Sequence, residues 1–180
     1  MTNTFSPLAT YDRDAVRHWT YGTASTQVPI PPPTGSPYLS DLSFVSGANG
    51  WGPVERDSSN GEQAAGDGQP ITIRGTAYTK GLGVHAAADV AFYLGGNCTR
   101  LTATVGIDDE VAPYGSVTFA LVADGRTLTT TPVLTGDSTA VPLDVDVSGV
   151  QDLHLVVQDG GDGNAHDHAD WADARLTCAQ

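Results

Sequence analysis

The chain has 180 residues, of which 39% are hydrophobic and only 16% are charged, with 21 glycines and 11 prolines. This composition is typical of a turn-rich β protein that is long enough to bury a core of its own. The formal net charge of −13 disfavours nucleic acid and anionic membrane surfaces as partners, because both repel an acidic protein. No apolar run approaches the roughly 20 residues that a membrane-spanning helix needs.

Residues 1–37 differ from the rest of the chain and are predicted to form an irregular N-terminal extension that ends in a linker. The run 28–35 is rich in proline, which favours an extended polyproline conformation. The first residues do not combine a basic stretch with an apolar one, so we expect no signal peptide there. The chain is interpreted as a piece of a longer secreted protein.

Residues 38–178 carry the pattern of an all-β domain, either a β-sandwich or a jelly roll. In the run 116–123, Val117, Phe119 and Leu121 alternate with other residues, so one face of the strand points toward a core. Asp124-Gly125 then predicts a hairpin turn, because glycine accepts the positive φ that such turns require. Short strands at this spacing are typical of sandwiches. Further strands are predicted at residues 71–73, 90–94, 101–105, 143–147, 153–157 and 171–176.

The two cysteines, Cys98 and Cys178, each lie at the edge of a predicted strand. An even number of cysteines without C-x-x-C spacing disfavours a metal or redox motif and favours a disulfide. This disulfide would close a loop of roughly 80 residues, which the loop-entropy model values at about 4 kcal/mol. The alternative is a pair of unrelated buried thiols.

Two polar motifs stand out between the predicted strands: residues 80–86, with the sequence KGLGVHA, and residues 167–171, with the sequence DHADW. Both combine glycine or alanine with residue types that bind polyhydroxylated ligands. Proteins bind sugars with an aromatic ring against the apolar face of the pyranose and with polar side chains paired to its hydroxyls. We therefore expect the loops around Trp51, His85 and His168 to meet at one end of the sandwich.

Several sequence blocks, found in order over roughly residues 38–177, resemble the NPCBM family of carbohydrate-binding modules. The resemblance implies a jelly-roll β-sandwich that is appended to bacterial glycoside hydrolases. It also implies non-catalytic binding of galactose-type sugars, including blood-group-like glycans in some members, and a structural calcium. The blocks are residues 39–42 (LSDL), 49–57 (NGWGPVERD), 71–75 (ITIRG), 78–86 (YTKGLGVHA), 93–96 (YLGG), 105–110 (VGIDDE) and 168–174 (HADWADA).

Eight residues are predicted to contact the sugar, as ring platforms or as partners of its hydroxyls. The acidic run 108–110 is included because of the resemblance, since a solvated turn would otherwise explain three consecutive acids. The predicted sugar-binding residues are Trp51, Glu55, Lys80, His85, Asp108, Glu110, His168 and Trp171.

Most of these residues also have an ordinary structural interpretation. Trp51 is as readily explained by packing in the core, and core packing is favoured for Trp171, which opens a strand. His85 lies between two apolar residues and would then hydrogen-bond a buried carbonyl. Lys80 is most often a solvated charge, and turn amides would satisfy Glu55.

Calcium requires six to eight oxygen ligands, and jelly-roll lectin modules often place it where an early loop meets the last strand. A second acidic loop, residues 159–164, has suitable oxygen spacing but lacks the closing glutamate of an EF-hand. His166 and His168, with Asp170, are the residues of an alternative zinc site, although no third histidine lies nearby in sequence. The predicted calcium ligands are Asp57, Asn60 and Asp173.

The resemblance implies a non-catalytic module that binds a galactose-containing glycan and holds a tethered glycoside hydrolase domain near its substrate. One alternative is a glycosidase, which needs two carboxyl groups roughly 5 to 10 Å apart across a cleft. The chain has many acids, so their abundance alone does not support catalysis, and it lacks the G-x-S-x-G, H-E-x-x-H and P-loop motifs. The other alternative is a structural or accessory domain without a sugar site.

Overall fold

The computed structural model describes residues 19–20, 23–24 and 29–180, which fall into two units, Met1–Pro31 and Pro32–Gln180. In the first unit, the strands β1 (Trp19–Thr20) and β2 (Thr23–Ala24) pair antiparallel. Most of the predicted N-terminal extension therefore lies outside the described residues. No helix in the part of the chain that the structure describes is long and apolar enough to cross a membrane.

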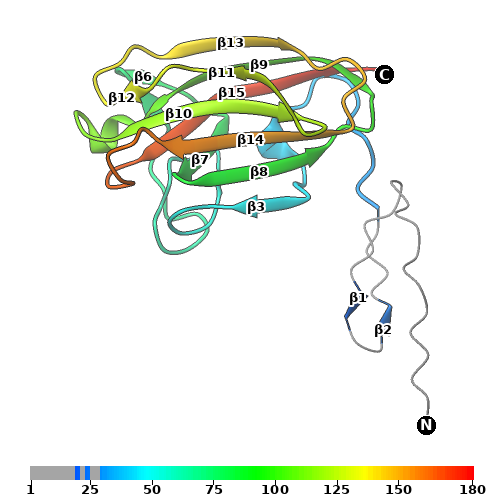
Figure 1. Ribbon diagram of the computed structural model, residues 1–180, viewed down its shortest axis with the longest axis horizontal. Helices are drawn as coiled ribbons and strands as arrows, with labels where there is room; N and C mark the ends of the chain where they lie inside the picture. Colours follow the sequence, from blue (N-terminus) through cyan, green and yellow to red (C-terminus); the bar gives the residue numbers. More distant parts are fainter. Residues whose placement is uncertain (1–18, 21–22, 25–28) are drawn as a thin grey trace. The chain divides into compact units, whose positions relative to one another are not determined.

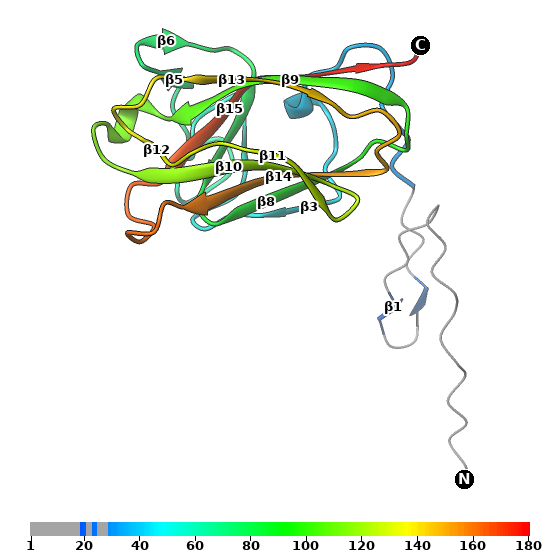
Figure 2. The same cartoon turned by 45° about the horizontal axis from the view of Figure 1, so that its top comes forward.

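The second unit is a sandwich of two antiparallel sheets, which Figures 1 and 2 show as two layers. One sheet has the order β11 (Arg126–Thr130), β10 (Ser116–Ala123), β14 (Asp152–Asp159), β8 (Ala88–Tyr93) and β3 (Ser46–Ala48), with β12 (Leu134–Thr135) beside β10. The other has the order β13 (Val141–Asp146), β9 (Cys98–Ile107), β15 (His168–Cys178), β7 (Gly81–His85) and β4 (Glu55–Arg56). The prediction of an all-β sandwich is confirmed.

The core between the sheets follows the predicted alternation. Val117, Phe119 and Leu121 of β10 are buried, and the residues between them are partly exposed. Trp171 of β15 is fully buried, and its ring meets that of Phe119 edge to face at a centroid distance of 5.2 Å. A side chain enclosed in this way cannot reach a ligand, so the assignment of Trp171 to the sugar site is corrected to a core role.

The structure confirms one local prediction, the turn at Asp124-Gly125, and corrects another, the strand at residues 71–73. Asp124 and Gly125 join β10 to β11 with φ values of 49° and 78°, so the predicted hairpin turn is confirmed. The run 71–73 is not a strand of the sandwich. It contributes to a small hairpin of β5 (Thr72–Ile73) and β6 (Thr76–Ala77), and its two isoleucines pack with Ala172 in a separate apolar cluster.

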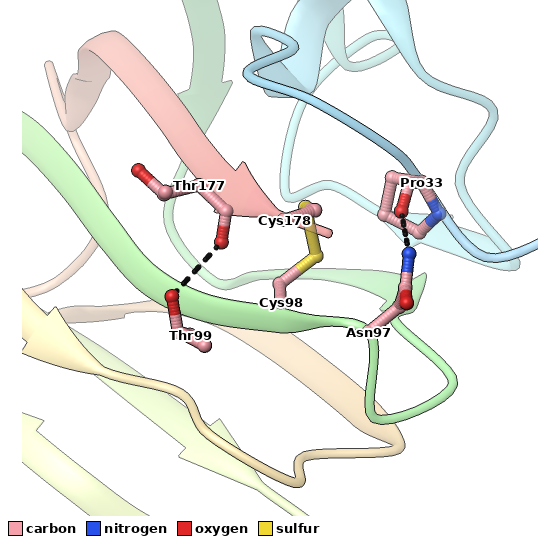
Figure 3. The surroundings of a disulfide bond; sticks show 6 residues. All are labelled: Pro33, Asn97, Cys98, Thr99, Thr177 and Cys178. Carbon is pink, nitrogen blue, oxygen red and sulfur yellow. Dashed lines mark hydrogen bonds between the residues drawn. A yellow bond between two sulfur atoms is a disulfide. The ribbon is translucent and has the colours of Figure 1, made fainter. Parts of the chain in front are cut away.

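The predicted disulfide is present, and it links neighbouring positions of β9 and β15 across 80 residues of sequence. Figure 3 shows Cys98 and Cys178 with the Asn97 side chain, whose Nδ2 donates to the Pro33 carbonyl at 2.8 Å. The backbone N–H of Cys178 donates to the Gly35 carbonyl at 2.7 Å. The compact unit therefore includes residues 32–37, which the sequence assigned to the linker, because they pair with the end of β15.

The strand β15 runs the length of the sandwich, with His168 as its first residue and Cys178 as its last. In Figure 1 the loop that joins β14 to β15 lies at the left end of the sandwich, and the C-terminus lies at the right end. The histidine motif and the disulfide thus occupy opposite ends of the domain. Residues 32–35 enter at the disulfide end, away from the histidines.

Candidate functional site

The candidate site begins with the loop that follows β3, where Asn49 holds Trp51 in place. Asn49 Oδ1 accepts from the backbone N–H of His85 at 2.7 Å, which fastens this loop to the end of β7. Its Nδ2 donates to the Trp51 carbonyl at 2.7 Å and to Asn60 Oδ1 at 2.9 Å. Trp51 keeps 53% of its surface exposed. A fixed backbone with an exposed indole ring is the arrangement expected of a platform for a ligand.

Three rings meet at this end of the sandwich. The Trp51 and His85 rings lie with centroids 5.8 Å apart, and the His85 and His168 rings with centroids 5.3 Å apart. His85 and His168 are direct partners in the antiparallel pairing of β7 with β15. Strand register therefore brings together two motifs that are about 80 residues apart in sequence. The structure places Trp51, His85 and His168 together, as the sequence led us to expect.

His168 lies between two carboxylates. Its Nδ1 is 2.7 Å from Glu110 Oε1, and its Nε2 is 3.4 Å from Glu62 Oε1. Burial alone lowers the pKa of His168, but the hydrogen bond to Glu110 and the nearby negative charges outweigh burial, so that the net shift is upward. The pairing favours an imidazolium ring whose two N–H groups point at carboxylates. The Glu62 and Glu110 side chains are 45% and 25% exposed, so both can also accept from ligand hydroxyls.

His85 has the opposite electrostatic character. Its side chain is almost fully buried, and burial lowers its pKa, which the neighbouring charge of His168 lowers further. Its Nδ1 is 2.9 Å from the Ala86 carbonyl oxygen. Because a carbonyl can only accept, Nδ1 carries the proton and Nε2 is left as an acceptor. The hydrogen bond of Nδ1 agrees with the structural interpretation of His85, and the burial of the side chain makes His85 a neighbour of the Trp51 ring rather than an exposed partner for a hydroxyl.

Lys80 does not belong to this cluster. It precedes β7, whereas His85 ends the same strand. Its ammonium group bridges Asp41 Oδ1 at 2.5 Å and Asp57 Oδ2 at 2.6 Å. These bonds tie η1 (Leu39–Asp41) to the segment after β4 and raise the pKa of Lys80. The placement of Lys80 in the sugar site is therefore corrected, because its charge is engaged at the other end of β7.

Glu55 and Asp108 are buried and accept hydrogen bonds from the backbone. Glu55 Oε2 accepts from the N–H of Gly66 at 2.8 Å. Asp108 accepts from the N–H groups of Thr72 at 2.9 Å and Glu110 at 2.8 Å, so it caps η2 (Asp109–Val111). Burial raises the pKa of Asp108. Both residues hold loops around the site rather than presenting carboxylates to a ligand, which corrects their predicted role.

Two of the three predicted calcium ligands, Asp57 and Asn60, have side-chain partners within the protein. Asp57 pairs with Lys80, and its Oδ1 accepts from the N–H of Gly81 at 3.1 Å. Asn60 Oδ1 accepts from Asn49, and Asp173 is exposed on β15. Among the described residues no group of three or more acidic, histidine or cysteine side chains is arranged to hold a metal. A structural calcium stays a prediction from the family resemblance.

The residues of the alternative zinc site are also separated. The His166 ring packs against Tyr114, and Asp167 Oδ1 accepts from the N–H of Ser116 at 2.9 Å. Burial raises the pKa of Asp167 to about 6. Asp170 is fully buried on β15, and burial, followed by the charge of Asp108, raises its pKa well above the ordinary value. In the described part of the chain, these side chains do not form a group that could hold a metal ion.

The model of the NPCBM/NEW2 domain family matches residues 35–177. The chain belongs to the NPCBM/NEW2 family. A CBM51 module from Clostridium perfringens GH95, solved in complex with methyl-galactose, is 34% identical with a TM-score of 0.72, covering 79% of this chain and 99% of that one. The CBM51-2 and INT domains of Clostridium perfringens ZmpB, solved with GlcNAc, are 31% identical with a TM-score of 0.71, covering 79% of this chain and 31% of that one. The domain thus resembles carbohydrate-binding modules of known structure.

Two curated relatives are much longer than this NPCBM/NEW2 chain. A Renibacterium salmoninarum protein named as a putative endo-alpha-N-acetylgalactosaminidase is 42% identical over 149 residues, which are 82% of this chain and 10% of that protein. Alpha-1,3-galactosidase B of Akkermansia muciniphila is 32% identical over 107 residues, which are 57% of this chain and 13% of that protein. The chain therefore spans about a tenth of the length of these relatives.

Sequence reasoning missed several residues of this NPCBM/NEW2 site. Asn49 was recognised only as part of a motif, although it fastens the Trp51 loop to β7. Glu62 is not among the predicted sugar-binding residues, yet it faces His168. The signal that could have identified Asn49 is its position directly before Gly-Trp-Gly, where a side-chain amide often organises a turn.

Gly50→Ala is expected to weaken ligand binding by displacing the Trp51 loop. A Cβ at Gly50 would lie 2.1 Å from the Ala86 carbonyl oxygen and 2.8 Å from the Ala87 nitrogen, and both are backbone atoms that cannot simply move aside. We expect a loss of about 1 to 3 kcal/mol in unfolding free energy, as for overpacked sites. Calorimetric titration with methyl-galactoside, together with urea unfolding, measures both effects.

Gly125→Ala is the matched control. It strains a turn of positive φ but meets no atom within 4 Å, and the turn lies between β10 and β11. This variant should lose roughly 1 kcal/mol of stability while its ligand affinity stays within twofold. Equal affinities for the two variants and the unchanged protein would show that the Gly50 contact does not position the site.

Proposed function

We propose that the chain is a non-catalytic carbohydrate-binding module that recognises galactose-type glycans at the Trp51 end of the sandwich. The observation that supports it most directly is the exposed Trp51 ring beside the His85 and His168 rings, with carboxylates of Glu62 and Glu110 at His168. This is an aromatic platform next to partly exposed hydrogen-bond acceptors, the two elements that sugar recognition requires.

Galactose suits this arrangement for a chemical reason. Its axial 4-hydroxyl leaves the C–H groups of positions 3, 4 and 5 on one face, which forms an apolar patch for an indole ring. The hydroxyls then lie at the edge of the platform, where the partly exposed carboxylates of Glu62 and Glu110 can accept from them. The glucose epimer places its 4-hydroxyl differently and would leave a polar group of the site without its partner.

The relatives support the same class of ligand. A CBM51 module that is 34% identical was solved with methyl-galactose, and two longer relatives bear names of galactosaminidase and galactosidase activities. We infer that the module is attached to a glycoside hydrolase and raises the local concentration of that enzyme on its glycan. The disulfide Cys98–Cys178 supports an extracellular location, since disulfides persist in oxidising compartments.

Calorimetry with matched sugars tests this proposal. We expect methyl-galactoside to bind with a dissociation constant of roughly 10 μM to 1 mM, because one monosaccharide buries few atoms. Methyl-glucoside should bind at least about tenfold more weakly. N-acetylglucosamine belongs in the same series because of the ZmpB complex.

A second measurement separates a binding module from an enzyme. Incubation with an aryl galactoside should release no phenol above the spontaneous rate. Release of phenol would contradict the non-catalytic assignment. Absence of binding to every sugar of a broad glycan array would instead support a structural domain without a sugar site.

A further inference from the structure

Two exposed aromatic side chains lie at the same end of the sandwich. Trp51 is 53% exposed and Tyr114 is 63% exposed. Each of them lies against a histidine ring: Trp51 against His85, and Tyr114 against His166 at a centroid distance of 5.2 Å and an interplanar angle of 34°. Among the tryptophan, tyrosine and phenylalanine residues whose burial the structure describes, only Trp51 and Tyr114 are exposed.

The loop that carries His166 forms hydrogen bonds with Ala86, the residue after His85. Asn164 Nδ2 donates at 3.3 Å to the Ala86 carbonyl oxygen, the same oxygen that accepts from His85 Nδ1. The N–H of Ala86 donates to the Asp167 carbonyl at 3.2 Å, which fixes the loop just before β15. His166 stands two residues before His168. The His166 ring therefore belongs to the same rim as His85 and His168.

The loop that carries Tyr114 is held at the same rim from the other side. Tyr114 follows η2, whose Glu110 binds His168, and the Tyr114 N–H donates to the Val111 carbonyl at 3.0 Å. Two residues later, the Ser116 N–H donates to the Asp167 side chain at 2.9 Å. Both members of the Tyr114–His166 pair are thus fixed at the backbone while their rings face solvent.

We propose that Tyr114 and His166 form a second sugar subsite beside the Trp51 site, so that the preferred ligand is a galactoside carrying at least one further sugar residue. This inference rests on the proposed function of the Trp51 site. A pair that served only to pack the two loops together would be expected to be buried, whereas Tyr114 and His166 are both exposed. An exposed ring next to a monosaccharide site offers a stacking face for the neighbouring pyranose.

Calorimetric titrations compare two monosaccharide probes, methyl α- and β-galactoside, with two disaccharide probes, lactose and an α-linked digalactoside. We expect at least one disaccharide to bind about tenfold more tightly than the matching monosaccharide. Tyr114→Ala should remove this gain and leave the affinity for the monosaccharides within twofold. Tyr114→Phe keeps the ring and should retain the gain.

Val45→Ala is the matched control, because Val45 is also exposed, at 40%, and precedes β3, whereas the Trp51 loop follows that strand. Its affinities for all four sugars should equal those of the unchanged protein. Thermal unfolding of each variant checks that Tyr114→Ala remains folded at the titration temperature.

Three results would overturn the inference. If a monosaccharide binds but neither disaccharide binds more tightly, the second subsite is absent while the proposed function stands. If Tyr114→Ala weakens monosaccharide and disaccharide equally, Tyr114 contacts the terminal sugar instead of a neighbouring one. If no sugar binds to the unchanged protein, the second subsite fails together with the proposed function.

Discussion

Trp51→Ala is expected to reduce the affinity for methyl-galactoside by about 30-fold or more, which corresponds to the roughly 2 kcal/mol that a dominant aromatic contact contributes. The indole ring is the exposed aromatic surface next to His85. Among the described residues, the other ring beside His85 belongs to His168, which is buried. Truncation leaves the sugar hydroxyls with their partners but removes the face on which the pyranose rests.

Stability should change little in this variant. Trp51 is more than half exposed, and the backbone of its loop is held by Asn49 rather than by the indole ring. Surface substitutions of this kind usually alter the unfolding free energy by about 0.5 kcal/mol or less. Calorimetric titration gives the affinity, and urea unfolding of the same sample shows whether any loss comes from the fold.

Trp51→Phe separates the role of the ring from the role of the loop. A smaller aromatic face should keep part of the affinity, so we expect its dissociation constant to lie between that of the unchanged protein and that of Trp51→Ala. Affinity that is the same for Trp51→Ala and the unchanged protein would show that the sugar does not rest on this ring.

Removal of the disulfide is expected to have the largest effect on stability. The double variant Cys98→Ala, Cys178→Ala should lose about 4 kcal/mol of unfolding free energy, because its unfolded chain is no longer closed into a loop. For a domain of this size, that loss lowers the melting temperature by roughly 8 to 16 °C. The bond joins β9 to β15 next to the residues 32–35 that pair with the end of the sandwich.

Ligand affinity in the folded double variant should remain within twofold of the original. Cys178 and His168 are the last and first residues of β15, so the disulfide lies at the opposite end of the sandwich from the rings. A reductant should lower the melting temperature of the unchanged protein toward that of the variant and leave the variant itself unaffected. An unchanged melting temperature would contradict a stabilising role for the bond.

The candidate site shows which predictions a sequence supports and where they fail. His168 and Trp171 fall in one motif, and both were assigned to the sugar site. They are three residues apart on β15, and side chains an odd number of positions apart on a strand point to opposite faces. One therefore lies at the rim and the other in the core. The sequence alone could have predicted this separation, because it depends only on a strand that contains both residues.

Lys80 and Glu62 could not be placed in this way. Lys80 precedes β7 and His85 ends it, so the strand separates them, but the residues that Lys80 binds, Asp41 and Asp57, come from η1 and from the segment after β4. Glu62 reaches His168 only because the long segment between β4 and β5 folds back toward that end of the sheet. Neither fact has a periodic or local signal, since both depend on contacts between segments that are distant in sequence.

The sequence by itself determined the β-sandwich class, the turn at Asp124-Gly125, the cysteine pair and the two motifs, because each follows from residue type and from the two-residue period of a strand. Only the tertiary structure decided which polar residues share the rim. Strand order and register place His85 opposite His168, and long loops deliver Trp51 and Glu62 to them. The physical reason is that alternation fixes the face of a side chain but carries no information about its neighbours across the sheet.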